Sequence, residues 1–69
     1  MRLVDAIAEA SGHAAQARRT ESECRTKAHQ WIDAGNTVDA AACSREAARQ
    51  SARAEAWERA AKLMTEVTP

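Results

Sequence analysis

Apolar and small residues recur along the first half of the chain at alternating steps of four and three. The first-arm stripe consists of Leu3, Ile7, Ala10, Ala14, Ala17, Glu21, Cys24, Ala28, Trp31 and Gly35. This is the heptad spacing of a helix that packs along one side against another helix. The stripe keeps its phase past Gly12 and past residues 20–23, which fit a capping box. A break near Gly12 or Thr20 would give a three-helix chain, but the unbroken phase favours one helix over about residues 2–34.

The midpoint of the chain combines a signal that ends a helix with a signal that begins one. Gly35 can adopt the left-handed backbone conformation that ends a helix. Asn36 or Thr37 can cap the following helix, and Asp39 favours the positive end of its dipole. The sequence therefore predicts an all-α fold, in which a turn at 35–37 connects two antiparallel helices in a hairpin.

The second arm, expected over residues 38–67 of a single 1–69 domain, carries two stripes. The strict stripe has unbroken three-four spacing and consists of Ala40, Cys43, Ala47, Gln50, Ala54, Trp57, Ala61 and Met64. The interrupted stripe has extra four-residue steps near its centre and consists of Val38, Ala41, Arg45, Ala48, Ala52, Ala56, Ala60, Leu63 and Val67.

A helix with two apolar stripes needs two neighbours, and the hairpin supplies only one. We therefore expect a homodimer that forms a four-helix bundle. The candidate interface residues lie on the strict stripe and are Cys43, Ala47, Ala54, Trp57, Ala61 and Met64.

The composition supports association. The hydrophobic fraction is 45%, but most of it is alanine, and the chain has no Phe or Tyr. At about 25 cal/mol per Å² of buried apolar area, so few large side chains give a 69-residue monomer only a marginal core. Trp31 and Trp57, the two aromatic residues, are expected to fill space that the alanines leave in the bundle.

Charged residues indicate how the arms align. If the chain folds back at residue 36, two positions lie side by side when their residue numbers sum to about 72. The opposite-charge pairs in this alignment are Glu23 with Arg49, Arg18 with Glu55, and Lys27 with Glu46. Exposed pairs contribute under about 1 kcal/mol each, so they indicate alignment more than stability.

Catalytic and metal-binding motifs do not emerge from the sequence. The possible metal ligands Cys24, Cys43, His13 and His29 form no chelating pair on one helix. We therefore expect free thiols, no metal, no cofactor and no enzymatic activity.

The charge balance and the first residues limit which partners and which location we expect. Ten basic and ten acidic residues give a net charge of zero, which argues against general binding to polyanions. No run of eighteen apolar residues is present, and charges at Arg2 and Asp5 argue against a signal peptide. We expect no membrane association and a cytoplasmic location, where the two cysteines stay reduced.

Two segments resemble known proteins. Residues 28–36, AHQWIDAGN, resemble the first helix of a tetratricopeptide repeat, although such repeats occur in arrays and this segment occurs once. Residues 54–63, AEAWERAAKL, resemble the small Ala/Arg-rich helical proteins of actinobacteria and their phages. This second resemblance implies a small accessory protein, inside a bacterial host cell if it is a phage product, and assigns no functional residue.

Two functions fit these observations. The first is a non-enzymatic interaction or assembly protein that associates with itself and with a protein partner. The alternative is a small nucleic-acid-binding regulator, a dimeric hairpin that uses the four-residue stripe Arg45, Arg49 and Arg53. Acidic residues interleave with these cations, so we expect nucleic acid not to be the partner.

Overall fold

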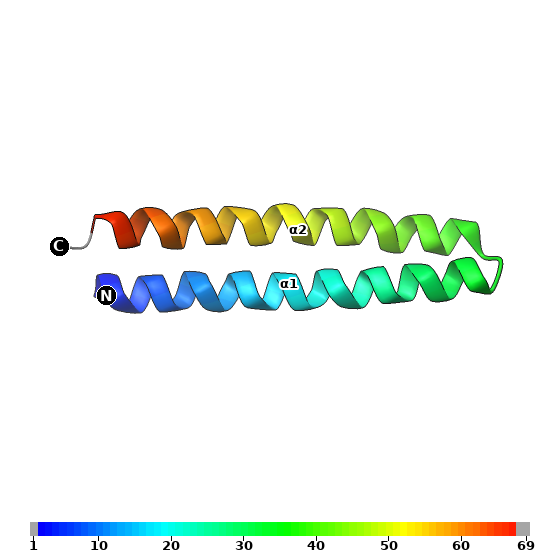
Figure 1. Ribbon diagram of the computed structural model, residues 1–69, viewed down its shortest axis with the longest axis horizontal. Helices are drawn as coiled ribbons and strands as arrows, with labels where there is room; N and C mark the ends of the chain where they lie inside the picture. Colours follow the sequence, from blue (N-terminus) through cyan, green and yellow to red (C-terminus); the bar gives the residue numbers. More distant parts are fainter. Residues whose placement is uncertain (1, 68–69) are drawn as a thin grey trace.

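The computed structural model describes residues 2–67, which form two helices and no strand. Helix α1 spans Leu3–Asp33 and helix α2 spans Thr37–Glu66. The two helices lie side by side and antiparallel, so that the beginning of α1 and the end of α2 meet at one end of a rod (Figure 1). The rod measures 53 × 14 × 13 Å. The all-α hairpin predicted from the sequence is confirmed.

Helix α1 is continuous through both positions where a break was conceivable. A Cβ atom at Gly12 would meet nothing within 4 Å, so this glycine lies on an open face of the helix. The Thr20 hydroxyl donates to the Gln16 carbonyl oxygen at 3.1 Å, one turn earlier in the same helix. The Thr20 hydroxyl is therefore bonded back within α1 and does not cap a new helix.

The turn follows the residues that the sequence marks for it. Gly35 has a φ of +79°, and its N–H donates to the carbonyl of Ile32, while the N–H of Asn36 donates to the carbonyl of Trp31. These two bonds satisfy carbonyls that the end of α1 would otherwise leave free. The Asn36 side chain then accepts from the backbone N–H of Asp39 at 3.0 Å, so Asn36 is the cap of α2.

The core between the helices is made of alanine. The buried side chains of the described residues are Ala10, Ala14, Ala17, Ala28, Ala40, Ala47 and Ala54. Four come from the first-arm stripe and three from the strict stripe. Because alanine presents only a methyl group, the two backbones approach closely along the middle of the rod.

The centre of the strict stripe therefore packs inside the hairpin, and the assignment of Ala47 and Ala54 to an oligomer interface is wrong. Ala47 and Ala54 have no exposed surface within the single chain, so no second chain can contact them. Cys43, Ala61 and Met64 are half-buried along the same contact, and Trp57 retains 37% of its surface. The reason is periodicity, since a regular three-four stripe stays against a neighbouring helix, whereas the interrupted stripe winds around α2.

Candidate interaction surfaces

The hairpin has two long flanks, where the grooves between α1 and α2 open to solvent. We name one the arginine flank, around Ser11, Ala15, Arg18, Ser51 and Glu58. We name the other the tryptophan flank, around His13, Gln16, Thr20, Gln50, Arg53 and Trp57. The two flanks differ in chemistry, because ion pairs close the first and aromatic rings border the second.

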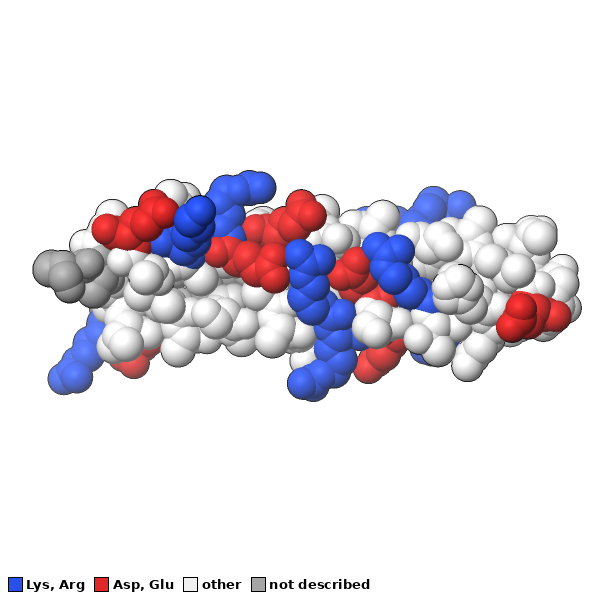
Figure 2. Space-filling view, viewed as in Figure 1, with Lys and Arg blue, Asp and Glu red and all other residues white. Residues whose placement is uncertain are grey.

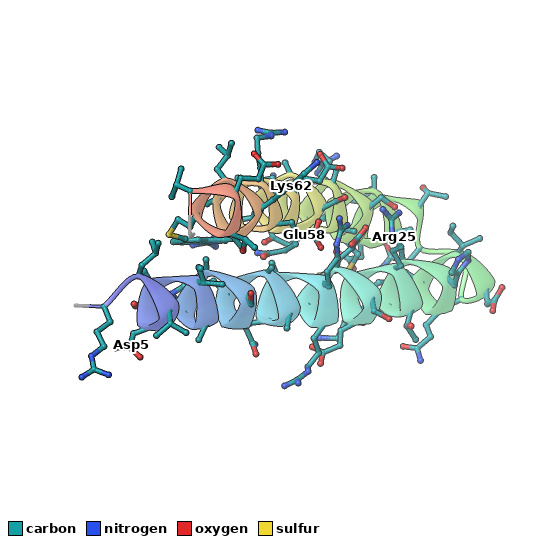
Figure 3. All side chains as sticks on the ribbon, turned by 60° about the vertical axis from the view of Figure 1, so that its left-hand side comes forward. Asp5, Arg25, Glu58 and Lys62 are labelled. Atoms are coloured by element: carbon teal, nitrogen blue, oxygen red, sulfur yellow. The ribbon has the colours of Figure 1, made fainter. Side chains whose placement is uncertain are left out.

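Arg18 joins the two helices on the arginine flank. Its guanidinium donates to both carboxylate oxygens of Glu58, through Nη2 at 2.8 Å and Nε at 3.2 Å. Its Nη1 donates to Glu21 at 3.0 Å and to the Ser51 hydroxyl at 3.3 Å. Glu58 thus lies at the junction of the helices, whereas Asp5 and Lys62 lie on their outer sides (Figure 3).

These contacts shift the pKa values of the groups involved. Hydrogen bonding to Glu58, and then to Glu21, raises the pKa of Arg18 above its ordinary value. Hydrogen bonds from Arg25 and then from Arg18 lower the pKa of Glu21. The Arg18 bond likewise lowers the pKa of Glu58. Arg18, Glu21, Arg25 and Glu58 therefore form one connected set of ion pairs on this flank.

The charge alignment predicted from the sequence is only partly realised. Arg18 does reach α2, but it pairs with Glu58, one turn beyond the expected Glu55. Glu46 bonds to Arg49 and Gln50 of its own helix, and hydrogen bonding to Gln50 and then to Arg49 lowers its pKa. Within residues 2–67 the structure holds no ion pair between Glu46 and Lys27, and Glu46 pairs instead with Arg49 on the next turn of α2.

The tryptophan flank contains a ring stack between the helices. His13 of α1 and Trp57 of α2 lie with ring centroids 4.5 Å apart and planes inclined by 28°. Beside them is a groove of about 310 Å³, open on its outer side. Its lining combines an indole, an imidazole, two amides, a hydroxyl and a guanidinium, from Trp57, His13, Gln16, Gln50, Thr20 and Arg53, over the methyl of Ala17.

Trp31 lies on the same flank as this groove. It follows His13 by eighteen residues, which is five full turns of helix, so it projects from the same side of α1 as His13. It retains 40% of its surface, and Trp57 retains 37%. Both tryptophans of the chain are therefore half-exposed on one side of the rod. The sequence did not predict this, because heptad spacing alone places both rings in a core.

The predicted arginine stripe is not a uniform basic surface. Arg49 donates to Glu46 through Nε at 2.9 Å, so its charge is compensated within α2. Arg53 borders the groove on the tryptophan flank, and Arg45 lies exposed one turn before Arg49. Acidic and basic side chains alternate over the middle of the visible face (Figure 2). The structure places the three arginines along one helix, where Glu46 pairs with the middle one, Arg49.

The residues considered for metal binding are not brought together. Cys24 and Cys43 are half-buried free thiols. Among residues 2–67, no three His, Cys, Asp or Glu side chains converge in a way that could hold a metal ion. His29 is exposed on α1, and His13 is engaged with Trp57 and lies 3.8 Å from Glu9.

Comparison of the chain with protein-family models, curated proteins and solved structures gives no match. Neither of the two described helices has both the length and the apolar character needed to cross a lipid bilayer.

The two flanks therefore offer two different kinds of surface. The ionised groups of the arginine flank are neutralised by one another. The tryptophan flank presents aromatic surface with hydrogen-bonding groups around it, which is the composition of a protein contact.

Proposed function

We propose that this chain is a small non-enzymatic assembly protein that acts by self-association and by binding a protein partner. Large apolar side chains usually fill a protein core, and the observation that carries the proposal is that this chain does the reverse. The core holds alanines, while large apolar side chains remain on the surface of the hairpin. These are Leu3, Val4, Trp31, Ile32, Val38, Trp57, Leu63 and Val67.

The exposed area supports the same proposal. The chain has an accessible surface of 4984 Å². A compact monomer of this mass is expected to expose about 4,200 Å². The surplus, about 700 Å², is close to the roughly 800 Å² that each partner contributes to a stable protein interface. Burying one interface of ordinary size would therefore reduce the exposed area of the hairpin to that of a compact protein.

Two separate apolar surfaces are available for self-association and for a partner. The tryptophan flank is one of them. The other is the interrupted stripe, where Ala41, Ala48, Ala52 and Ala56 are exposed between Val38 and Leu63. The outer face of α1 lacks such a stripe, since its exposed positions include Asp5, Arg19 and Asp33. A bundle of four helices would use one of these surfaces and leave the other free.

Sedimentation equilibrium of the full chain tests the proposal. We expect a monomer–dimer equilibrium in the micromolar range and a melting temperature that rises with protein concentration, because association stabilises the folded state by mass action. A single monomeric mass and a concentration-independent melting temperature throughout that range would contradict self-association.

A further inference from the structure

We infer that two copies of the hairpin associate through their tryptophan flanks, antiparallel to each other, about a two-fold axis near Cys24. In this arrangement Trp31 of each copy enters the groove beside the His13–Trp57 stack of the other. The inference rests on the proposed self-association and identifies the surface and the pairing that carry it.

The spacing of residues along α1 supports this axis. Cys24 lies midway between Trp31 and Ala17, seven residues from each, on one line of the helix. Seven residues of helix correspond to about 10.5 Å. A two-fold axis at Cys24, perpendicular to the rod, therefore brings Trp31 of one copy level with Ala17 of the other, and Ala17 forms the floor of the groove. The same operation places the second Trp31 in the second groove.

The groove fits an indole in size and chemistry. A cavity of about 150 Å³ holds a benzene molecule, and this groove is about twice as large at roughly 310 Å³. The side-chain oxygens of Gln16 and Gln50 can accept the indole N–H. The guanidinium of Arg53, which borders the groove, can lie against the ring face.

The antiparallel pairing is favoured over the parallel one by the position of Trp31. With a two-fold axis along the rod, the two grooves would face each other and each Trp31 would lie over the start of the partner's α2, near Asp39. Neither Trp31 would then enter a groove. The antiparallel pairing instead covers all four half-exposed tryptophans, two from each copy.

Oxidative cross-linking with the native cysteines tests the axis. The two copies of Cys24 lie on it and come within the Cα separation of a disulfide, at most about 7 Å. His13 is level with Trp57, so by the same count Cys24 is level with Glu46, three residues from Cys43. The two copies of Cys43 are then six residues apart along the rod, about 9 Å. After mild oxidation, Cys43→Ser should give a covalent dimer and Cys24→Ser should remain a monomer on a non-reducing gel.

A pair of alanine variants tests the occupant of the groove. Trp31→Ala should weaken the dimerisation constant from sedimentation equilibrium by at least about tenfold, as for a residue central to an interface. Ile32→Ala is the matched control, because Ile32 is the next residue, is 57% exposed and projects about 100° away from Trp31 around the helix. It should change the constant less than about threefold, the effect of a peripheral contact. Circular dichroism checks that both variants keep their helices.

The outcomes separate this inference from the proposal beneath it. A wild-type chain that stays monomeric contradicts both. A wild-type dimer in which Cys43→Ser does not cross-link, or in which Trp31→Ala and Ile32→Ala weaken association equally, overturns the tryptophan-flank pairing and leaves self-association standing. Cross-linking of Cys24→Ser through Cys43 overturns the position of the axis.

Discussion

His13 and Trp57 stack across the two helices with ring centroids 4.5 Å apart. They are the only pair of rings in contact among the described residues. The stack adds a cross-helix contact on the tryptophan flank, opposite the Arg18–Glu58 pair on the arginine flank. A ring stack on one flank and an ion pair on the other therefore both connect α1 to α2.

The stack predicts a measurable coupling between its members. Trp57 is 37% exposed, so Trp57→Ala should destabilise the hairpin by about 1–2 kcal/mol, below the 3–5 kcal/mol expected for a fully buried tryptophan. A double-mutant cycle with His13→Ala, measured by urea unfolding, should give a coupling of about 0.5–1.5 kcal/mol. Strictly additive effects of the two substitutions would show that the rings lie together without stabilising each other.

The size of the core alanines predicts a large difference between two leucine substitutions on α2. Ala54→Leu places a bulky side chain where nothing is exposed, so it should cost about 1–3 kcal/mol or more by forcing the helices apart. Ala52→Leu lies on the exposed interrupted stripe and should change stability by at most about 0.5 kcal/mol. Urea unfolding at one low protein concentration compares them. Equal losses would mean that the helices do not pack as described.

The two glycines predict opposite responses to alanine. Gly35→Ala should destabilise by about 1–2 kcal/mol, because the backbone there has a φ of +79° that a Cβ atom disfavours. Gly12→Ala should stabilise by about 0.5–1 kcal/mol, since Gly12 lies in the middle of α1 with open space around it. Melting temperatures of both variants test this pair, and a stabilised Gly35→Ala chain would contradict the turn geometry.

The arginine flank predicts how stability depends on pH. The pKa values of Glu21 and Glu58 are lower in the folded chain than the ordinary value of 4.5. Their contribution to stability is therefore present above pH 4.5 and is lost as the pH falls through their folded pKa values. Melting curves should show this acid loss, and Glu58→Gln should reduce it. Glu23→Gln is the control, because the structure gives Glu23 no ion pair within residues 2–67, and it should leave the acid loss unchanged.

The interleaved charges predict weak interaction with nucleic acid. Because Arg49 is held by Glu46, the stripe offers few free cations to phosphates. Submicromolar protein should give no gel shift with duplex DNA or with unrelated RNA at physiological ionic strength. A shift that disappears when Arg49 and Arg53 are both changed to Glu would instead support the regulator hypothesis.

The fold could be predicted because local signals agree with one another along the chain. Gly35 and Asn36 end one helix and begin the next by hydrogen bonds that depend only on near neighbours. The heptad stripes then require the two helices to pack. This is enough to specify a hairpin and its turn.

The candidate surfaces could be predicted less well, because they depend on how the helices rotate about their axes. Periodicity identified two stripes on α2 but did not show which one faces α1. The regular spacing of Ala47 and Ala54 decides this, since only that stripe stays in contact over the full length. The same rotation leaves Trp31 and Trp57 exposed. It also brings Glu58, and not Glu55, within reach of Arg18. A helical-wheel calculation on both arms together could have found the tryptophan flank.

The alanine core also limits how this sequence can vary. Alanine is the smallest side chain that still favours a helix, so almost every substitution at the seven buried positions adds atoms. In an ordinary core, an enlarged residue can be offset by shrinking its neighbour. Here the neighbours are alanines too. Only glycine is smaller, and each replacement of a helical alanine by glycine costs about 1 kcal/mol of stability. The inner faces should therefore drift very slowly in related chains, and most accepted change should fall on the outer faces, where new binding specificities can arise while the hairpin stays the same.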